Sequence, residues 1–460
     1  MRIAHFIQRY PPAIGGAEAY FARLSRFLAS QGDEITVFTS TAIALEAFWD
    51  RRAPALNPGV TRDEGVIVRR YGLSRWPGRR YLLKAASLWP HRLWQCLTMP
   101  CNPICPGMWR DCGREPLAFD AVHAAAFPYA WPIACGLRLA RRLGVPFFLT
   151  PFLHLGDPDD SNDRARRGYL SPALLWLLRQ ADGVFVQTPT ERDVLLGLGL
   201  ARQRVHLQGL GVDPCECTGG VRFMTRERWG ANPETMVVGH LANNSWEKGT
   251  IDLLLAVEQL WKRGRAVRVA LAGPDMPNFR SFWSGFAARN GERARRDVVR
   301  LGPLTETEKK NFFAGIDVFA LPSRSDSFGL VLLEAWANGL ANVAYRAGGI
   351  ADVIRPGIDG LLVRCGDINR LAEAITELHH DAALRQKLGA AGHGRLPFEF
   401  RWQDKLTIVQ NVYGESVRLR LALAHGGQAL NENDSVPYDR MSLTTSPDTS
   451  VKRKSRLWKR

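Results

Sequence analysis

The feature that most constrains the fold is an alternation of short apolar strands and amphipathic helices that runs along the chain twice. The first series starts with an apolar run at residues 3–7 and a helical pattern at 17–30. The second series starts near Met236. Strands that alternate with helices build a parallel sheet with helices on its faces, because parallel strands need a crossover connection. We therefore predict an α/β fold of two Rossmann-like, doubly wound domains that face each other across a cleft.

The two series and the composition of the remaining segments divide the chain. We assign residues 1–208 to the first domain and residues 209–400 to the second. Within the first domain, residues 69–114 form an insertion that mixes arginine with tryptophan and breaks often at proline. We expect residues 401–425 to form a helix that packs back on the first domain. Residues 426–460 are polar and basic, and we predict that this tail is disordered.

The composition excludes a fibrous or wholly disordered protein. Apolar residues make up 46% of the 460 residues and charged residues 23%, which is ordinary for a globular chain. The uncharged stretch at residues 121–137 is shorter than the about 20 apolar residues that a membrane-spanning helix needs. The N-terminus lacks the apolar run and cleavage site of a signal peptide. We therefore expect a cytoplasmic protein.

The eight cysteines indicate neither a metal site nor a disulfide framework. The spacing within the cluster of Cys96, Cys101, Cys105 and Cys112 matches no zinc module. We expect reduced thiols, as is usual in the cytoplasm, and no bound metal.

Two segments at the ends of first-domain strands are candidates for ligand contact. Gly15 and Gly16 stand between the first strand and the first helix, and Glu18 follows them. Glycines there let the backbone approach a ligand closely, and the helix N-terminus offers N–H groups to an anion. Two glycines at a strand–helix turn are more often a tight turn without a ligand. His154 stands just past the strand at 147–150, where an ordinary polar residue is as typical as a functional one.

The second domain offers a similar pair, His240 and Lys248, at the end of its first strand. Lys248 lies just before the helix that begins near Thr250. A cation beside a helix N-terminus provides two positive elements for a diphosphate. A solvated lysine and a histidine satisfied at a strand end are the alternative interpretation.

The segment 320–335 is the strongest candidate, because it holds two carboxylates. Asp326 lies in a polar loop after a strand, and Glu334 lies on the following, otherwise apolar helix. A carboxylate at Glu334 suits the vicinal hydroxyl groups of a sugar, although a paired buried acid would explain it as well. We expect Ser325 or Ser327 to cap this helix. Its first turn would then face an anion in the cleft, which adds four donor-contact candidates: Ser327, Phe328, Gly329 and Leu330.

Together these segments resemble the retaining glycosyltransferases of GT-B fold, in the large family four of nucleotide-sugar enzymes. The resemblance covers residues 1 to about 415, and the motifs occur in the family's order. They are Gly-Gly-Ala-Glu at 15–18, Phe-Asp-Ala-Val-His at 119–123, His154, Gly-Leu-Gly-Val-Asp at 209–213, Gly-His-Leu at 239–241, Lys-Gly at 248–249, Leu-Ala-Gly at 271–273, Leu-Gly at 301–302, the Asp326–Glu334 segment and Gly-Gly at 348–349.

The resemblance implies that the second domain binds the nucleotide sugar and the first binds the acceptor. Lys248 would hold the diphosphate and Glu334 the ribose. Asp326 and His154 would contact the donor sugar, so that these two and Lys248 are the catalytic candidates. Gly16, next to Gly15, would approach the phosphates through its backbone. The family retains the anomeric configuration and needs no metal ion or other cofactor.

Two positions depart from the family pattern. The family usually carries arginine where this chain has His240, which predicts weaker or pH-dependent stabilisation of the phosphates. Asp326 is one methylene shorter than the usual glutamate.

The insertion 69–114 allows two interpretations. Basic residues interleaved with tryptophan and leucine suit an anionic membrane interface, at which lipid-linked glycan acceptors are held. An irregular insertion that packs its aromatic residues inward has the same composition. The net charge of +16 also fits nucleic acid, but no recognition pattern supports that partner. The expected partners are a nucleotide-sugar donor, a glycan or lipid-linked acceptor and, on the first interpretation, the inner face of the plasma membrane.

The leading functional prediction is a retaining hexosyltransferase of surface polysaccharide biosynthesis. A sugar-nucleotide epimerase of the same fold is one alternative. A catalytically degenerate sugar-nucleotide-binding protein is another, motivated by His240.

Overall fold

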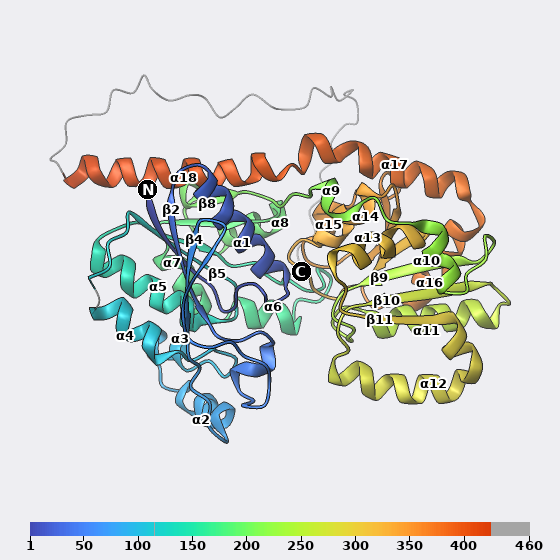
Figure 1. The fold of residues 1–460 in the computed structure, drawn as a ribbon, viewed down its shortest axis with the longest axis horizontal. Coiled ribbons are helices and arrows are strands. Elements are labelled where there is room, and N and C mark those ends of the chain that lie inside the picture. Colours follow the sequence, from blue (N-terminus) through green and yellow to red (C-terminus); the bar gives the residue numbers. More distant parts are fainter. Residues whose placement is uncertain (115, 425–460) are drawn as a thin grey trace, which may run out of the picture.

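The computed structural model describes residues 1–114 and 116–424 as two α/β domains, each built on its own sheet (Figure 1). The predicted fold class is therefore confirmed. The predicted disordered tail, residues 426–460, lies outside the described residues.

The first domain is built on an eight-stranded sheet with the order β3-β4-β2-β1-β5-β6-β7-β8. All its neighbouring strands are parallel except β3 and β4, which pair antiparallel. The strands are β1 (Arg2–Phe6), β2 (Glu34–Ser40), β3 (Gly59–Asp63), β4 (Val66–Tyr71), β5 (Ala121–Ala125), β6 (Phe147–Thr150), β7 (Gly183–Val186) and β8 (Val205–Leu207). The central strands are buried along almost their whole length, as expected for a sheet covered on both faces.

Helices cover both faces of this sheet (Figure 1). They are α1 (Gly16–Ser30), α2 (Arg79–Ala86), α3 (Arg92–Leu97), α4 (Pro106–Arg114), α5 (Ala130–Leu143), α6 (Arg164–Tyr169), α7 (Pro172–Gln180) and α8 (Pro189–Gly197), with short 3-10 turns at Leu45–Phe48 and Arg202–Arg204.

The second domain has a six-stranded, wholly parallel sheet with the order β11-β10-β9-β12-β13-β14. Its strands are β9 (Met236–Leu241), β10 (Val267–Ala272), β11 (Val298–Gly302), β12 (Val318–Leu321), β13 (Ala341–Tyr345) and β14 (Gly360–Val363). The helices from the linker to the second sheet's end are α9 (Pro214–Cys217), α10 (Arg222–Arg228), α11 (Thr250–Lys262), α12 (Pro277–Asp297), α13 (Glu306–Gly315), α14 (Leu330–Ala337), α15 (Ile350–Val353), α16 (Ile368–His380) and α17 (Ala382–Glu399).

The insertion predicted at residues 69–114 is more regular than its composition suggests. It begins inside β4 and contains α2, α3 and α4. The hairpin of β3 and β4 was not predicted, because Glu64 and Gly65 form its tight turn without a familiar two-residue signal. In the described part of the chain, no helix combines the length and apolarity needed to cross a bilayer.

The last described helix, α18 (Trp402–Ala424), returns from the second domain and lies along the first (Figure 1). Tyr413 on this helix is fully buried, and its hydroxyl is hydrogen-bonded to Nδ1 of His123 on β5. Nearer the end of the helix, Arg420 donates to Asp182 at 3.0 Å. The helix thus completes the covering of the first sheet.

The chain passes between the domains twice, and the two passages touch. The N–H group of Val212 donates to the carbonyl oxygen of Phe400 at 2.9 Å, and Val212 forms an isolated parallel bridge with Arg401. A Cβ atom at Gly211 would lie 2.8 Å from that same Phe400 oxygen. Only glycine allows the two segments to approach this closely.

Candidate active site

Lys248 and Asp326 form an ion pair at the carboxyl ends of two adjacent strands. Lys248 lies between β9 and α11, and Asp326 lies between β12 and α14. Lys248 Nζ donates to Asp326 Oδ2 at 2.7 Å, and the side chains are 24% and 18% exposed. This edge of a parallel sheet is where ligands bind in doubly wound domains. The pair is therefore half-buried but accessible to a ligand.

His154 reaches the same place from the first domain, after β6. Its ring donates from Nδ1 to the carbonyl oxygen of Ser325, 3.2 Å away. Burial and the neighbouring ammonium of Lys248 lower the pKa of His154 to about 4, although Asp326 acts in the opposite direction. The imidazole is therefore neutral at physiological pH, and its other nitrogen is a hydrogen-bond acceptor. Three residues that are remote in the sequence meet at the boundary of the domains.

The charge on Asp326 is set by a balance of opposing effects. Burial is the largest single effect and would raise its pKa, but the charge and hydrogen bond of Lys248, with smaller contributions from His154 and the Phe328 N–H, together lower the pKa of Asp326 below its ordinary value. The site therefore contains a carboxylate and an ammonium side by side, next to a neutral imidazole.

Two glycine turns hold the loop that carries Asp326. Gly348 has a φ of +51°, and a Cβ atom there would lie 2.2 Å from the carbonyl oxygen of Asp326. The Gly348 N–H donates to the carbonyl oxygen of Gly156 in the first domain at 2.8 Å, and Gly349 N–H donates to that of Asp326 at 2.9 Å. On the other side, a Cβ atom at Gly249 would lie 1.8 Å from the oxygen of Pro322. The glycines therefore allow the segment from Pro322 to Asp326 to pack directly on the backbones of the Gly249 turn and the Gly348 turn.

The start of α14 differs from the prediction. Neither Ser325 nor Ser327 caps the helix; the N-cap is Gly329, with a left-handed φ of +86° and no side-chain hydrogen bond. Phe328 is buried in the hydrophobic core beneath this turn. The first N–H groups of the helix, from Leu330 onward, lack intrahelical partners, as in any α-helix. An anionic ligand could accept hydrogen bonds from them.

Glu334 lies one turn further along α14 and is paired with Lys309 on α13. Lys309 Nζ donates to Glu334 Oε1 at 2.8 Å, and the side chains are 24% and 19% exposed. Burial would lower the pKa of Lys309, but the Glu334 carboxylate raises it above its ordinary value. The sequence analysis missed Lys309, because nothing in its own segment relates it to Glu334.

The turn at Gly15 and Gly16 is shaped by a buried ion pair. Arg9 lies 2.7 Å from the carboxylate of Glu18, and the two side chains are 9% and 3% exposed. A Cβ atom at Gly15 would lie 2.1 Å from Glu18 Oε2, whereas one at Gly16 would meet nothing within 4 Å. Position 15 therefore requires glycine because the Glu18 carboxylate occupies the place of a side chain. Gly16, in contrast, has open space beside it. Arg9 is a second residue that the sequence analysis did not single out.

The structure corrects the expected role of His240. Its side chain is fully buried, with Nδ1 2.9 Å from the carbonyl oxygen of Ala320 and Nε2 2.9 Å from the Thr250 hydroxyl. Burial lowers the pKa of His240 to about 4. Both ring nitrogens are used inside the domain, so that the imidazole ties β9 to β12 and α11 instead of reaching donor phosphates. Because its pKa is about 4, the ring does not change its charge near neutral pH, so that a pH-dependent phosphate contact is not expected from His240.

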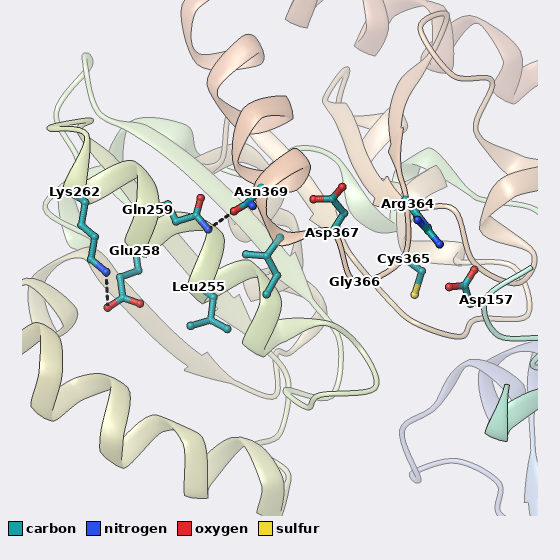
Figure 2. Close-up of a pocket in the computed structure, with 11 residues that line it drawn as sticks. Asp157, Leu255, Glu258, Gln259, Lys262, Arg364, Cys365, Gly366, Asp367 and Asn369 are labelled. Atoms are coloured by element: carbon teal, nitrogen blue, oxygen red, sulfur yellow. Dashed lines mark hydrogen bonds and ion pairs between the residues drawn. The ribbon is translucent and has the colours of Figure 1, made fainter. Parts of the chain in front are cut away.

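A separate hollow of about 720 Å³ lies over α11 and the start of α16 and ends at Asp157 of the first domain (Figure 2). The hollow is lined by Glu258, Lys262 and Asp367, among others, and by none of the predicted site residues.

Among residues 1–114 and 116–424, no group of three or more His, Cys, Asp or Glu side chains is placed to hold a metal ion. All eight cysteines are free thiols.

Two parallel-sheet α/β domains with these residues at their facing strand ends define a glycosyltransferase of the GT-B class. Residues 15–211 match the family described as Glycosyl transferase 4-like domain, and residues 221–395 match Glycosyl transferases group 1. The chain therefore belongs to the GT4-type glycosyltransferases of GT-B fold, and the resemblance inferred from the sequence is confirmed.

Known relatives cover most of the chain. It is 27% identical over 430 residues to the D-inositol 3-phosphate glycosyltransferase of Stackebrandtia nassauensis, and the match covers 88% of each protein. Sucrose-phosphate synthase from Thermosynechococcus elongatus has a TM-score of 0.69 at 20% identity, covering 90% of this chain and 98% of that one. Anabaena HepE, solved in complex with UDP and glucose, has a TM-score of 0.64 at 17% identity, covering 90% and 99%. The two solved structures share the fold of this chain.

Proposed function

We propose that this protein is a retaining, metal-independent glycosyltransferase that moves a hexose from a nucleotide-sugar donor to a lipid-linked glycan acceptor in surface polysaccharide synthesis. The observation that carries the proposal is the cluster of Lys248, Asp326 and His154, which joins the two domains around an ammonium and a carboxylate. A donor with a diphosphate and sugar hydroxyls offers a partner to each of these groups. The UDP and glucose bound by Anabaena HepE support a donor of this kind.

Lys248 would neutralise the diphosphate. Its ammonium faces a single carboxylate in the unliganded site, and a diphosphate carries more negative charge than Asp326. Binding of the donor would therefore draw Lys248 toward the phosphates, together with the first N–H groups of α14. Asp326 would then accept hydrogen bonds from the sugar hydroxyls. His154, which is neutral, would accept one more through Nε2.

Glu334 would bind the nucleotide ribose. Its carboxylate can accept hydrogen bonds from two vicinal hydroxyl groups, and Lys309, which now occupies one of its oxygens, would have to share or leave that oxygen. The Lys309–Glu334 contact therefore holds the carboxylate in place before the nucleotide arrives.

The reaction that we propose leaves the anomeric configuration unchanged. The bond between the anomeric carbon and the diphosphate oxygen breaks, and the acceptor oxygen bonds to the same face of that carbon. The acceptor's proton passes to the departing phosphate oxygen, so that no protein nucleophile is needed. Lys248 and the helix N-terminus stabilise the charge on the leaving diphosphate. These positive groups would do the work that other transferases assign to a metal ion.

The choice of acceptor is a further part of the proposal. The proteins similar to this chain are named for different compounds, D-inositol 3-phosphate in one case and sucrose phosphate in another. The first domain would make this choice, because it supplies the other wall of the site. We propose a lipid-linked glycan and a position at the cytoplasmic face of the plasma membrane.

The test has two stages. A thermal-shift screen with UDP, GDP, ADP and their sugars identifies the nucleotide, because a ligand that binds only the folded state raises the midpoint of unfolding. The selected donor is then incubated with lipid-linked and soluble acceptors, with and without EDTA, and the product's anomeric configuration is read by NMR. We expect transfer with retention that EDTA does not reduce. Nucleotide binding without turnover, epimerisation of the donor, or an inverted product would each contradict the proposal.

A further inference from the structure

We propose that the tip formed by α2, the turn after it and the start of α3 (residues 79–94, the α2–α3 tip) docks on an anionic lipid bilayer. The proposal deepens the proposed function, because it states how a membrane-held acceptor would be reached. Its own observations are independent of the donor site.

The α2–α3 tip exposes large apolar side chains to an unusual degree. Five of them protrude: Tyr81 (82% exposed), Leu82 (60%), Leu88 (80%), Trp89 (68%) and Trp94 (45%). Large apolar side chains are common at the surface singly, but a cluster of five within one short segment indicates an interaction site. Leu88, Trp89 and Trp94 also line a mainly apolar hollow of about 770 Å³ in this tip.

The other part of the same insertion behaves differently. Trp109 on α4 packs against Trp131, with ring centroids 6.2 Å apart, and Arg138 lies 4.3 Å from its ring centroid. Cys112 and Met108 on the same helix are fully buried. The inward-packing interpretation therefore holds for α4, and the exposed aromatic residues are confined to the α2–α3 tip.

The charge around the tip favours an anionic partner. Residues 65–110 contain eight Lys and Arg and no Asp or Glu. Arg80, Lys84 and Arg92 are exposed within the tip itself. Cations that flank exposed tryptophan and leucine are the pattern of a surface that lies in the headgroup region, where the apolar side chains enter the acyl boundary.

The position of the tip fits a peripheral contact. Figure 1 shows α2 at the end of the first domain opposite to α18, and Tyr81, Leu82, Leu88 and Trp89 of the tip remain exposed there. The tip is a protrusion with a hollow and not a flat sheet or a groove for a helix. A nucleic acid would use the cations but leave five apolar side chains unburied, and a bilayer would use both.

The experiment measures co-sedimentation of the full chain with vesicles of phosphatidylcholine, with or without phosphatidylglycerol. We expect binding only with phosphatidylglycerol, weakened by salt. Trp89→Ser should weaken binding about tenfold or more, because the variant lacks the large apolar side chain that would be buried in the bilayer. Lys84→Glu should weaken it at least about fivefold, which is the contribution of one cation near an anionic surface. Matched controls are Phe398→Ser, an exposed aromatic residue on α17 (83% exposed), and Lys387→Glu on the same helix.

Several outcomes would overturn the proposal. The wild-type chain could fail to bind the anionic vesicles, or both tip variants could bind as tightly as their controls, which would place the contact elsewhere, including the basic end of the chain. The variants are also tested for binding to a soluble polyanion. If Lys84→Glu weakens that binding as much as it weakens vesicle binding, and Trp89→Ser does not weaken it, the partner is nucleic acid or another polyanion. Loss of self-association in Trp89→Ser would indicate a second copy of the chain. Thermal-shift binding of the nucleotide in the same variants tests the proposed function separately, since neither residue is near the donor site.

Discussion

Each carboxylate of the candidate site is held by a lysine. Lys248 lies against Asp326 at 2.7 Å. Lys309 lies against Glu334 at 2.8 Å. The four side chains are only 18% to 24% exposed, so that removing one partner leaves the other charge largely buried and unpaired. Each pair sets a carboxylate beside an ammonium that an anionic ligand can attract.

Replacing Lys248 should therefore remove activity and spare the fold. We expect Lys248→Ala to reduce transfer about a hundredfold or more, the usual cost of losing one group that stabilises a developing charge. The free energy of unfolding should also fall, by about 1 to 3 kcal/mol, because Asp326 keeps a largely buried charge without its partner. Initial rates and urea unfolding measure the two effects.

Glu334→Ala should act mainly on donor binding, because the ribose is part of the substrate in both ground and transition states. We expect a rise in the donor KM of about tenfold or more, with a smaller change in kcat. Lys387→Ala serves as a control for both variants. Full activity in either variant would contradict the assignment of that residue.

Glu191 provides a pH test that does not involve the donor site. Its side chain is fully buried, accepts a hydrogen bond from the Gln187 N–H at 2.7 Å, and burial raises its pKa from 4.5 to about 8 although that hydrogen bond lowers it. A raised pKa means that the folded state holds the proton more tightly. This contribution to stability is complete below the unfolded pKa and is lost as the pH rises through the folded one.

The variant Glu191→Gln cannot ionise, and it should escape that loss. As the pH rises from about 5 to about 9, the unfolding midpoint of the wild type should fall relative to that of the variant. Thermal melts of both proteins in matched buffers measure the difference. Parallel profiles would show that the pKa of Glu191 is not raised in the folded protein.

Among the elements, the turns decide where the site residues lie. Gly348, with its φ of +51°, packs on the backbone of Asp326, and the loop cannot retreat without losing its contact with Gly156. Gly357 also has a positive φ, of +74°, but a Cβ atom there would meet nothing within 4 Å. Alanine at Gly357 would therefore strain the backbone only, whereas alanine at Gly348 would strain the backbone and also collide with the Asp326 carbonyl oxygen.

Gly348→Ala should lower turnover because its Cβ atom displaces the Asp326 loop. We expect a fall of about tenfold or more in kcat/KM, since small misplacement of a reacting group is costly. Gly357→Ala should lose stability of about 1 kcal/mol from strain alone and keep its activity. Equal activity in the two variants would contradict the role of the turn.

The alternation of strands and helices predicted both sheets and placed Asp326 on a loop and Glu334 on a helix. Local pattern could not predict Lys309, because its contact with Glu334 depends on where the fold places α13 relative to α14. The cap of α14 was wrong because a left-handed glycine, Gly329, begins the helix where serine was expected. For His240, the sequence fixes its place on a strand but not which way its ring points.

For the whole molecule, α18 is the last described helix, and it attaches the segment that follows the second domain to the first sheet. Tyr413 is fully buried against His123, whose pKa burial lowers well below its ordinary value. The imidazole is thus neutral and depends on hydrogen bonds from its neighbours. Losing the Tyr413 hydroxyl would leave a buried nitrogen without this partner.

Tyr413→Phe should lower the free energy of unfolding by about 1 to 3 kcal/mol, the cost of an unsatisfied buried polar group. Leu419→Ala, an exposed residue (55%) of the same helix, should change it by less than about 0.5 kcal/mol. Urea unfolding followed by circular dichroism measures both. A Tyr413→Phe variant as stable as the wild type would mean that the hydroxyl contributes nothing to the docking of α18.

The contact between Val212 and Phe400 has a mechanical consequence. Because both connections between the halves run through this contact, we expect the halves to open by rotating about it. The backbone angles of the residues around Gly211 would absorb the rotation, with little change in the rest of either half. Some contacts between the domains involve residues that are far in the sequence from Val212 and Phe400, such as the ion pair of Asp159 with Arg346. These contacts would separate first when the enzyme opens to release its product.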